Sequence, residues 1–262
     1  MTYCIGLLLN QGLVMIADTR TNAGVDNFSS YKKLHTLESG PDRQIYACTS
    51  GSLSMSQSVI SLIMEGLPAT DGGEMSRTLG RCTTMFRVAQ LVGEAVQTAN
   101  RTVGAALEAI NLSSSVSLLV GGRIGKNPPQ LFQVYSAGNF IQGKSESPFL
   151  QIGETKYGKP ILDRGIEIDM PLDEAVKVAF LSFDSAMRSN LGVARPLDMI
   201  VMPRDPKAPV LARRIEPDDE YFNELSMRWA ILLHEATRAI PNPPFMQADG
   251  KAVEVEASRA AE

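Results

Sequence analysis

The chain of 262 residues contains only two histidines and three cysteines. With His35 and His234 as the whole histidine complement, neither a histidine-rich metal site nor a histidine-based catalytic dyad is expected. Cys4, Cys48 and Cys82 are odd in number and lie among apolar residues, which indicates buried thiols and not a disulfide framework or a zinc site. We therefore expect a cytoplasmic protein with no metal and no cofactor.

An excess of positive charge and a long apolar run are also lacking. The 25 Lys and Arg residues against 29 Asp and Glu give a net charge of −4, and no stripe of Lys or Arg marks a nucleic-acid surface. No apolar run is long enough to span a membrane, and the first residues lack the pattern of a secretory signal. The expected partners therefore include neither nucleic acid nor membrane, and the chemistry must come from hydroxyls, carboxylates, lysines and the amino terminus.

The first residues carry the strongest signal. Two apolar runs flank the turn formers Asn10 and Gly12, which predicts a β-hairpin. Thr2 directly follows Met1, so removal of Met1 would place an α-amine and a hydroxyl on one residue. An α-amine with a pKa of about 7.7–8.0 can act as a general base for that hydroxyl. Position alone favours the plainer alternative that threonine is simply a common second residue, so the interpretation depends on its neighbours.

The order of predicted elements indicates an α+β fold. Strands come first, then two helices over 52–67 and 76–109, then further strands, two helices within 157–164 and 172–189, and a last inner strand over 197–202. We expect Ser50 and Gly51 to break the strand before the first helix. Two sheets packed face to face, each covered by a helix pair, would form a four-layer αββα sandwich. We assign residues 1–215 to this domain and 216–262 to a helical extension with a flexible tail.

Several short motifs in this order resemble the proteasome β-subunit pattern of N-terminal threonine peptidases. They are Thr2, the turn at Gly12, Ala17-Asp18-x-Arg20, Gly24, Lys32-Lys33-Leu34 and the break from Cys48 to Ser52. The short loop before Lys33, the segment 183–190 and the long C-terminal tail resemble Anbu, the bacterial ancestral β-subunit branch related to the proteasome and HslV. The resemblance covers residues 2–203 and implies the N-terminal nucleophile (Ntn) hydrolase version of the αββα sandwich.

The resemblance also implies roles for four residues. Thr2 would be the nucleophile, with its own amine as proton acceptor, and Lys33 would stabilise the developing alkoxide. Asp18 would hold Lys33 charged and oriented, and Asp184 would support the surroundings of the nucleophile. Taken together with Thr2, the spacing of Asp18 and Lys33 favours the catalytic interpretation. For Asp184 an alternative stays open, because Arg188 four residues later predicts a surface ion pair.

Substrate contacts follow from the same resemblance. A backbone N–H near Ser50 or Gly51 would donate to the oxyanion. The backbone around Thr21, Asn22 and Ser50 would pair with an extended substrate by strand addition. One departure from the family pattern concerns Glu154, which stands where a serine usually completes the catalytic network. A second is that the usual Asp-x-x-Ser pattern is replaced in the segment that begins at Asp184.

Three functions remain open from the sequence. The first is a threonine-type endopeptidase that cleaves peptide or amide bonds inside a homo-oligomer. The resemblance implies about a dozen subunits, in a closed ring or an open helical turn. The second is a non-proteolytic Ntn amidase or acyl-transfer enzyme acting on a small amide, and the third is an assembly scaffold with weak or no turnover. No ATPase partner, physiological substrate or side-chain preference follows from the sequence.

Overall fold

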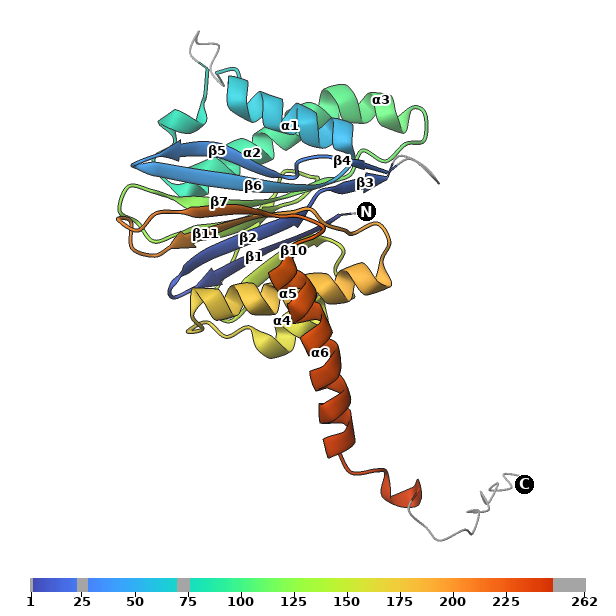
Figure 1. Cartoon of the computed structure of the whole chain (residues 1–262). Coiled ribbons are helices and arrows are strands. Elements are labelled where there is room, and N and C mark those ends of the chain that lie inside the picture. Colours follow the sequence, from blue (N-terminus) through green and yellow to red (C-terminus); the bar gives the residue numbers. More distant parts are fainter. Residues whose placement is uncertain (1, 23–27, 70–75, 247–262) are drawn as a thin grey trace, which may run out of the picture.

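The computed structural model describes residues 2–22, 28–69 and 76–246. Figure 1 shows four layers: helices α1 to α3, the sheet that contains β5 and β6, the sheet that contains β1 and β2, and helices α4 and α5. This arrangement confirms the predicted αββα sandwich. The predicted positions of Gly24 and of the flexible tail lie outside the described residues.

Two antiparallel five-stranded sheets form the inner layers. One has the order β10-β1-β2-β11-β12, and the other has the order β5-β6-β7-β8-β9. The strands of the first sheet are β1 (Tyr3–Leu9), β2 (Gly12–Asp18), β10 (Phe149–Gly153), β11 (Leu197–Pro203) and β12 (Leu211–Ile215). Those of the second are β5 (Leu34–Gly40), β6 (Arg43–Gly51), β7 (Val116–Ile124), β8 (Gln130–Val134) and β9 (Phe140–Gln142). A short ribbon of β3 (Arg20–Asn22) and β4 (Phe28–Ser30) stands beside them.

The N-terminal hairpin forms as predicted, with Leu9 opposite Gly12 and Cys4 opposite Ala17. All seven residues of β2 are buried, and so are six of the seven in β1. Continuous burial is possible because one face of these strands meets the second sheet and the other meets a helix layer. The start of β1 consequently brings the amino-terminal segment into the interior of the molecule.

Three apolar clusters join the four layers. The first, with Val59 and Val92, lies between the helices α1 and α2 and the β5–β9 sheet. The second, with Ile16 and Phe183, lies between the β1-containing sheet and the helices α4 and α5. The third includes Cys4 and fills the space between the two sheets. Each sheet therefore has apolar residues on both faces, as the long uninterrupted runs in β1, β2 and β7 predict.

Two predicted boundaries differ in the structure, the end of strand β6 and the start of helix α2. Strand β6 continues through Gly51, so Ser50 and Gly51 do not break it, because both still pair with β7. The predicted helix over 76–109 begins only at Met85, since the Thr84 hydroxyl accepts a bond from Arg87 N and caps α2 there. The helices are α1 (Leu53–Glu65), α2 (Met85–Ala99), α3 (Ala105–Glu108), α4 (Lys159–Gly165), α5 (Leu172–Ser189) and α6 (Glu220–Ala239). A 3₁₀ turn at Leu79–Arg81 precedes α2, and a π-helical turn, Asn100–Gly104, joins α2 to α3.

Helix α6 begins on the body of the protein and then extends away from it (Figure 1). Phe222 is buried in the cluster beneath α5, whereas every residue from Ile231 to Ala239 is exposed. No helix in the described part of the chain is long and apolar enough to cross a membrane. The division into a domain of residues 1–215 and a C-terminal extension stays a prediction.

Candidate active site

Thr2 lies at the open end of the sandwich, immediately before β1, and only 8% of its surface is exposed. Its carbonyl oxygen accepts a hydrogen bond of 2.7 Å from Glu154 N. Gly153 has φ +83°, and a Cβ there would lie 2.2 Å from the Thr2 carbonyl oxygen. Only glycine allows β10 to approach the amino-terminal residue this closely. The sequence around Gly153 therefore fixes the position of the Thr2 backbone.

Tyr3 anchors the same segment on its other side. Its side chain is fully buried, its ring packs against Phe183, and its hydroxyl lies 2.7 Å from Ser182 Oγ. Ser182 Oγ also donates to the carbonyl of Gly158 at 2.8 Å. No pattern in the sequence indicates this network, because it joins residues separated by 179 positions. It ties the first strand to helices α4 and α5 and limits movement of the neighbouring Thr2.

Lys33 and Asp18 form a buried ion pair beside Thr2. The Lys33 ammonium donates to Asp18 Oδ1 at 2.8 Å and to the carbonyl of Arg20 at 2.6 Å. Asp18 is fully buried at the end of β2, and Lys33 is 5% exposed just before β5. The two residues come from neighbouring sheets, so the packing of the sheets is what brings them together. The predicted group of Thr2, Asp18 and Lys33 is thus assembled at one end of the sandwich.

The Asp18 carboxylate collects three donors. Tyr3 N donates to Oδ1 at 2.9 Å and Arg20 N donates to Oδ2 at 3.2 Å, in addition to the Lys33 ammonium. Burial raises the pKa of Asp18, while Lys33 and the two backbone N–H groups oppose that rise. Three donors directed at one carboxylate favour its ionised form. Asp18 can therefore hold the ammonium of Lys33 in a fixed orientation next to the threonine.

A cavity of about 460 Å³ opens beside Thr2. It is lined by Thr2, Thr21, Lys33, Thr49, Ser50, Gly51, Ser52, Leu53, Ser56 and Gly153. The predicted substrate residues Thr21, Ser50 and Gly51 are therefore at the cavity wall. The backbone of Asn22 continues β3 and pairs with Phe28. Gly51 has φ +103°, and a Cβ at this position would meet the Ser115 carbonyl at 2.1 Å, so glycine is required at the end of β6.

Glu154 is held beneath Thr2 by several donors. Its carboxylate accepts bonds from Lys156 N at 2.6 Å, from Tyr157 N at 3.3 Å and from Asn190 Nδ2 at 2.7 Å. Burial raises the pKa of Glu154, but these donors together outweigh burial and leave the pKa below its ordinary value. The sequence predicts no role for Asn190, because there it is recognisable only as a residue at the end of a helix. The pair of Glu154 and Asn190 links the Thr2 backbone to the C-terminal end of that helix.

Asp184 bonds to side chains of two outer helices. Its Oδ2 accepts a bond of 2.9 Å from Arg188 Nε, and its Oδ1 accepts a bond of 2.6 Å from Ser226 Oγ. These partners lie on α5 and α6, so the alternative of an ion pair with Arg188 is confirmed and is extended by the bond to α6. Among the described residues Asp184 makes no bond to Thr2, Lys33 or Glu154. Its side chain fastens the C-terminal helix to the body, and a role of Asp184 in supporting the surroundings of Thr2 stays a prediction.

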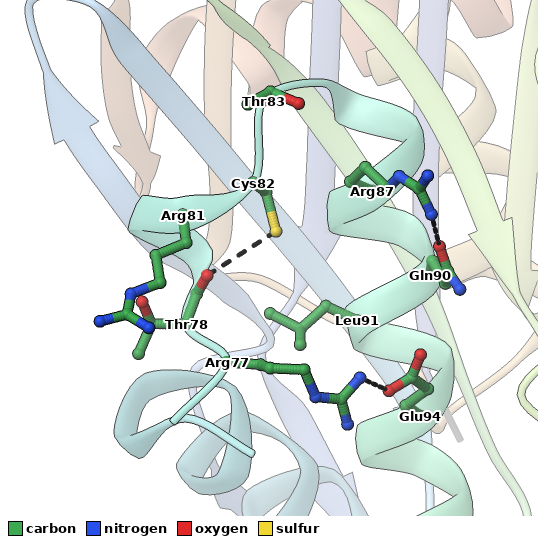
Figure 2. Close-up of a pocket in the computed structure, with 9 residues that line it drawn as sticks. All are labelled: Arg77, Thr78, Arg81, Cys82, Thr83, Arg87, Gln90, Leu91 and Glu94. Atoms are coloured by element: carbon green, nitrogen blue, oxygen red, sulfur yellow. Dashed lines mark hydrogen bonds and ion pairs between the residues drawn. The ribbon is translucent and has the colours of Figure 1, made fainter. Parts of the chain in front are cut away.

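A second cavity, of about 320 Å³, lies on the outer helix layer between the 3₁₀ turn and α2. Three arginines line it, but Arg77 is paired with Glu94, and Arg87 donates to Gln90. Figure 2 shows Arg81 and Arg87 directed to opposite sides of this cavity. Their guanidinium groups do not converge on one point, so this cavity is not a prepared anion site. Within the described ranges no cluster of three or more His, Cys, Asp or Glu could hold a metal ion.

Comparison with known proteins agrees with the fold and adds a family. The family described as Proteasome subunit matches residues 89–201. No curated protein sequence matches the chain. Among solved structures, Anbu from Hyphomicrobium sp. strain MC1 is 42% identical, covers 92% of this chain and 99% of its own, and has a TM-score of 0.80.

Two further structures are similar over nearly the whole chain. Anbu (ancestral beta-subunit) from Yersinia bercovieri is 35% identical over 92% of this chain and 98% of its own, with a TM-score of 0.80. The helical assembly of the Anbu complex from Pseudomonas aeruginosa is 38% identical over 94% of this chain and 100% of its own, with a TM-score of 0.84. Identity at this level over more than nine-tenths of both chains shows common family membership. The chain belongs to the Anbu family of proteasome-like proteins.

Proposed function

We propose that this protein is an N-terminal threonine hydrolase of peptide or amide bonds, active after removal of Met1. The observation that carries the proposal is the buried ion pair of Lys33 and Asp18, which shares a cavity edge with Thr2. An ammonium held in this position lowers the cost of forming an alkoxide on the threonine hydroxyl. The family relationship supports the same assignment.

The reaction would proceed in two steps, the formation of an ester on Thr2 and the hydrolysis of that ester. The Thr2 hydroxyl oxygen attacks the carbonyl carbon, its proton passes to the Thr2 α-amine, and a backbone N–H near Gly51 stabilises the oxyanion. As the C–N bond breaks, the leaving amine takes that proton and an ester remains on Thr2. A water molecule then attacks the ester and gives a proton to the α-amine. Breakage of the ester bond releases the carboxylic acid and restores the threonine hydroxyl.

Glu154 and Asn190 would act as positioning residues in this scheme. Glu154 N holds the Thr2 carbonyl, and the Glu154 carboxylate is fixed by Asn190 and two backbone donors. This arrangement replaces the serine-based network of the family pattern. Because the threonine backbone is held from β10 and from α5 together, its amine and hydroxyl keep one orientation.

We also propose that the protein assembles with copies of itself in the cytoplasm. The helical assembly of a relative that is 38% identical supports self-association, and the free thiols of Cys4, Cys48 and Cys82 suit a reducing compartment. A heterologous interface that does not close would build an open helical turn, and one that closes would build a ring. Sedimentation velocity of the purified full chain distinguishes these assemblies from a monomer.

The test of the hydrolase is intact mass spectrometry before and after exposure to a peptide epoxyketone. This reagent needs both the hydroxyl and the free amine of an N-terminal threonine to form its ring. We expect loss of Met1 and one adduct, which is retained in Thr2→Ser and lost in the nearly isosteric Thr2→Val. Retained Met1 contradicts catalysis and favours the scaffold. Loss of Met1 without an adduct contradicts peptide cleavage and favours a small-amide substrate.

A further inference from the structure

The cavity beside Thr2 has a wall of short hydroxyl side chains that no step of the proposed reaction uses. Apart from the nucleophile, the hydroxyl-bearing residues of this wall are Thr21, Thr49, Ser50, Ser52 and Ser56. Such hydroxyls can both donate and accept hydrogen bonds. A wall of this composition offers partners to a polar group of the substrate.

Among these residues, Ser50 has the hydroxyl with the most unused hydrogen-bonding capacity. Its residue surface is 6% exposed and lines the cavity, and its hydroxyl makes no hydrogen bond to any described residue. By contrast, Ser56 Oγ is already committed, because it donates to the Ser52 carbonyl at 2.9 Å. Thr49 is 4% exposed, and its hydroxyl has only a long contact of 3.5 Å with His35 Nε2. In the described part of the chain the Ser50 hydroxyl is not sealed from the cavity, so water can reach it until a substrate covers it. A covering group that offers no hydrogen bond would leave the hydroxyl unpaired, which is costly.

No side chain among the described lining residues offers an unpaired charge to a charged side chain of a substrate. Lys33 is the one ionisable side chain among the lining residues, and its ammonium is already paired with Asp18. Behind Thr49, burial and then the neighbouring Lys32 lower the pKa of His35, so its imidazole is neutral at neutral pH. Placing a lysine, arginine or carboxylate side chain here would bury a charge without a counter-ion.

We propose that this cavity selects substrates whose acyl-side residue carries an uncharged carboxamide or hydroxyl side chain, read by the hydroxyl of Ser50. The inference rests on the proposed hydrolase and names the substrate class of its site. A substrate that fills the cavity without a hydrogen-bonding group would cover the Ser50 hydroxyl and leave it unpaired. Sites built to bond a polar group discriminate strongly against an apolar analogue for this reason.

The experiment compares three epoxyketones that differ only in the residue next to the warhead: asparagine, its near-isostere leucine, and lysine. The labelling rate of Thr2 is followed by intact mass. We expect asparagine to label about tenfold faster than leucine or lysine. In Ser50→Ala the ratio of asparagine to leucine should fall towards one. Thr49 is the preceding residue of β6, so its side chain leaves the opposite face, and Thr49→Val should keep most of that ratio. The control Ser61→Ala alters an exposed serine of α1 outside the cavity and should leave the ratio unchanged.

Two failures are distinguishable in this design. Labelling by leucine or lysine as fast as by asparagine overturns the selectivity while the hydrolase stands. A ratio that stays the same in Ser50→Ala also overturns it, because another group would then read the side chain. Absence of labelling by all three reagents overturns peptide cleavage and this inference with it, and with Met1 retained it overturns the hydrolase itself.

Discussion

Replacement of Lys33 by methionine tests whether the ion pair beside Thr2 is held as the structure indicates. Methionine keeps most of the side-chain length but leaves the fully buried Asp18 without its ammonium partner. Breaking a buried pair by removing one partner costs about 3–5 kcal/mol. Asp18 would keep the two backbone donors at 2.9 and 3.2 Å, which places the expected loss at the lower end, about 3 kcal/mol.

The chain contains a matched control for this substitution. Lys159 and Asp163 form an ion pair on the surface of α4, with both side chains nearly half exposed. Lys159→Met should therefore cost at most about 0.5 kcal/mol. Urea unfolding followed by far-ultraviolet circular dichroism, at one protein concentration for all variants, gives both free energies of unfolding.

Lowering the pH should reduce the loss in the free energy of unfolding that Lys33→Met causes. Burial already raises the pKa of Asp18, and loss of the ammonium raises it further in the folded state. An acid with a raised folded pKa gains stability relative to the unfolded chain as pH falls through that pKa, because protonation removes the buried charge. The difference between wild type and variant should thus be largest at pH 7 and smaller at pH 4.5. A loss of unfolding free energy in Lys33→Met no larger than that in Lys159→Met, or an equal loss at both pH values, would refute the argument.

Three more predictions concern the support of Thr2. Glu154→Gln should lower the free energy of unfolding by about 1–2 kcal/mol at pH 7. Since the folded pKa of Glu154 is depressed, its contribution is present above the unfolded value of about 4.3 and is lost as pH falls through the folded pKa. Urea unfolding at pH 7 and pH 3.5 should show that loss, and an equal difference at both would contradict it. Gly153→Ala should cost at least about 2 kcal/mol in urea unfolding, because its Cβ would overlap the Thr2 carbonyl; an unchanged midpoint would count against the close approach. Asp184→Asn should speed hydrogen exchange in α6 around Ser226 without slowing epoxyketone labelling of Thr2. Slowed labelling with unchanged exchange would instead favour a role of Asp184 at the nucleophile.

The first hairpin and helix α5 were predictable because their signals are local. The turn at Gly12 between two apolar runs defines the first hairpin, and the apolar spacing from Leu172 to Ser189 defines a helix whose limits match the prediction. The helix start at Met85 was missed because a capping hydroxyl, and not the hydrophobic period, decides where the first turn begins. The strand end at Gly51 was missed because pairing with β7, a segment far along the chain, extends it.

For the site, sequence alone determined the residue types and their order, and with the family resemblance it named Thr2, Asp18 and Lys33. Only the tertiary structure showed which groups meet. It joined Glu154 to Asn190, gave Tyr3 its partner Ser182, and turned Asp184 towards α6. The physical reason is that each of these bonds joins residues at least 36 positions apart, so they depend on the packing of sheets and helices. Hydrophobic periodicity and turn chemistry act over a few residues, whereas a catalytic network depends on distances that only the complete fold defines.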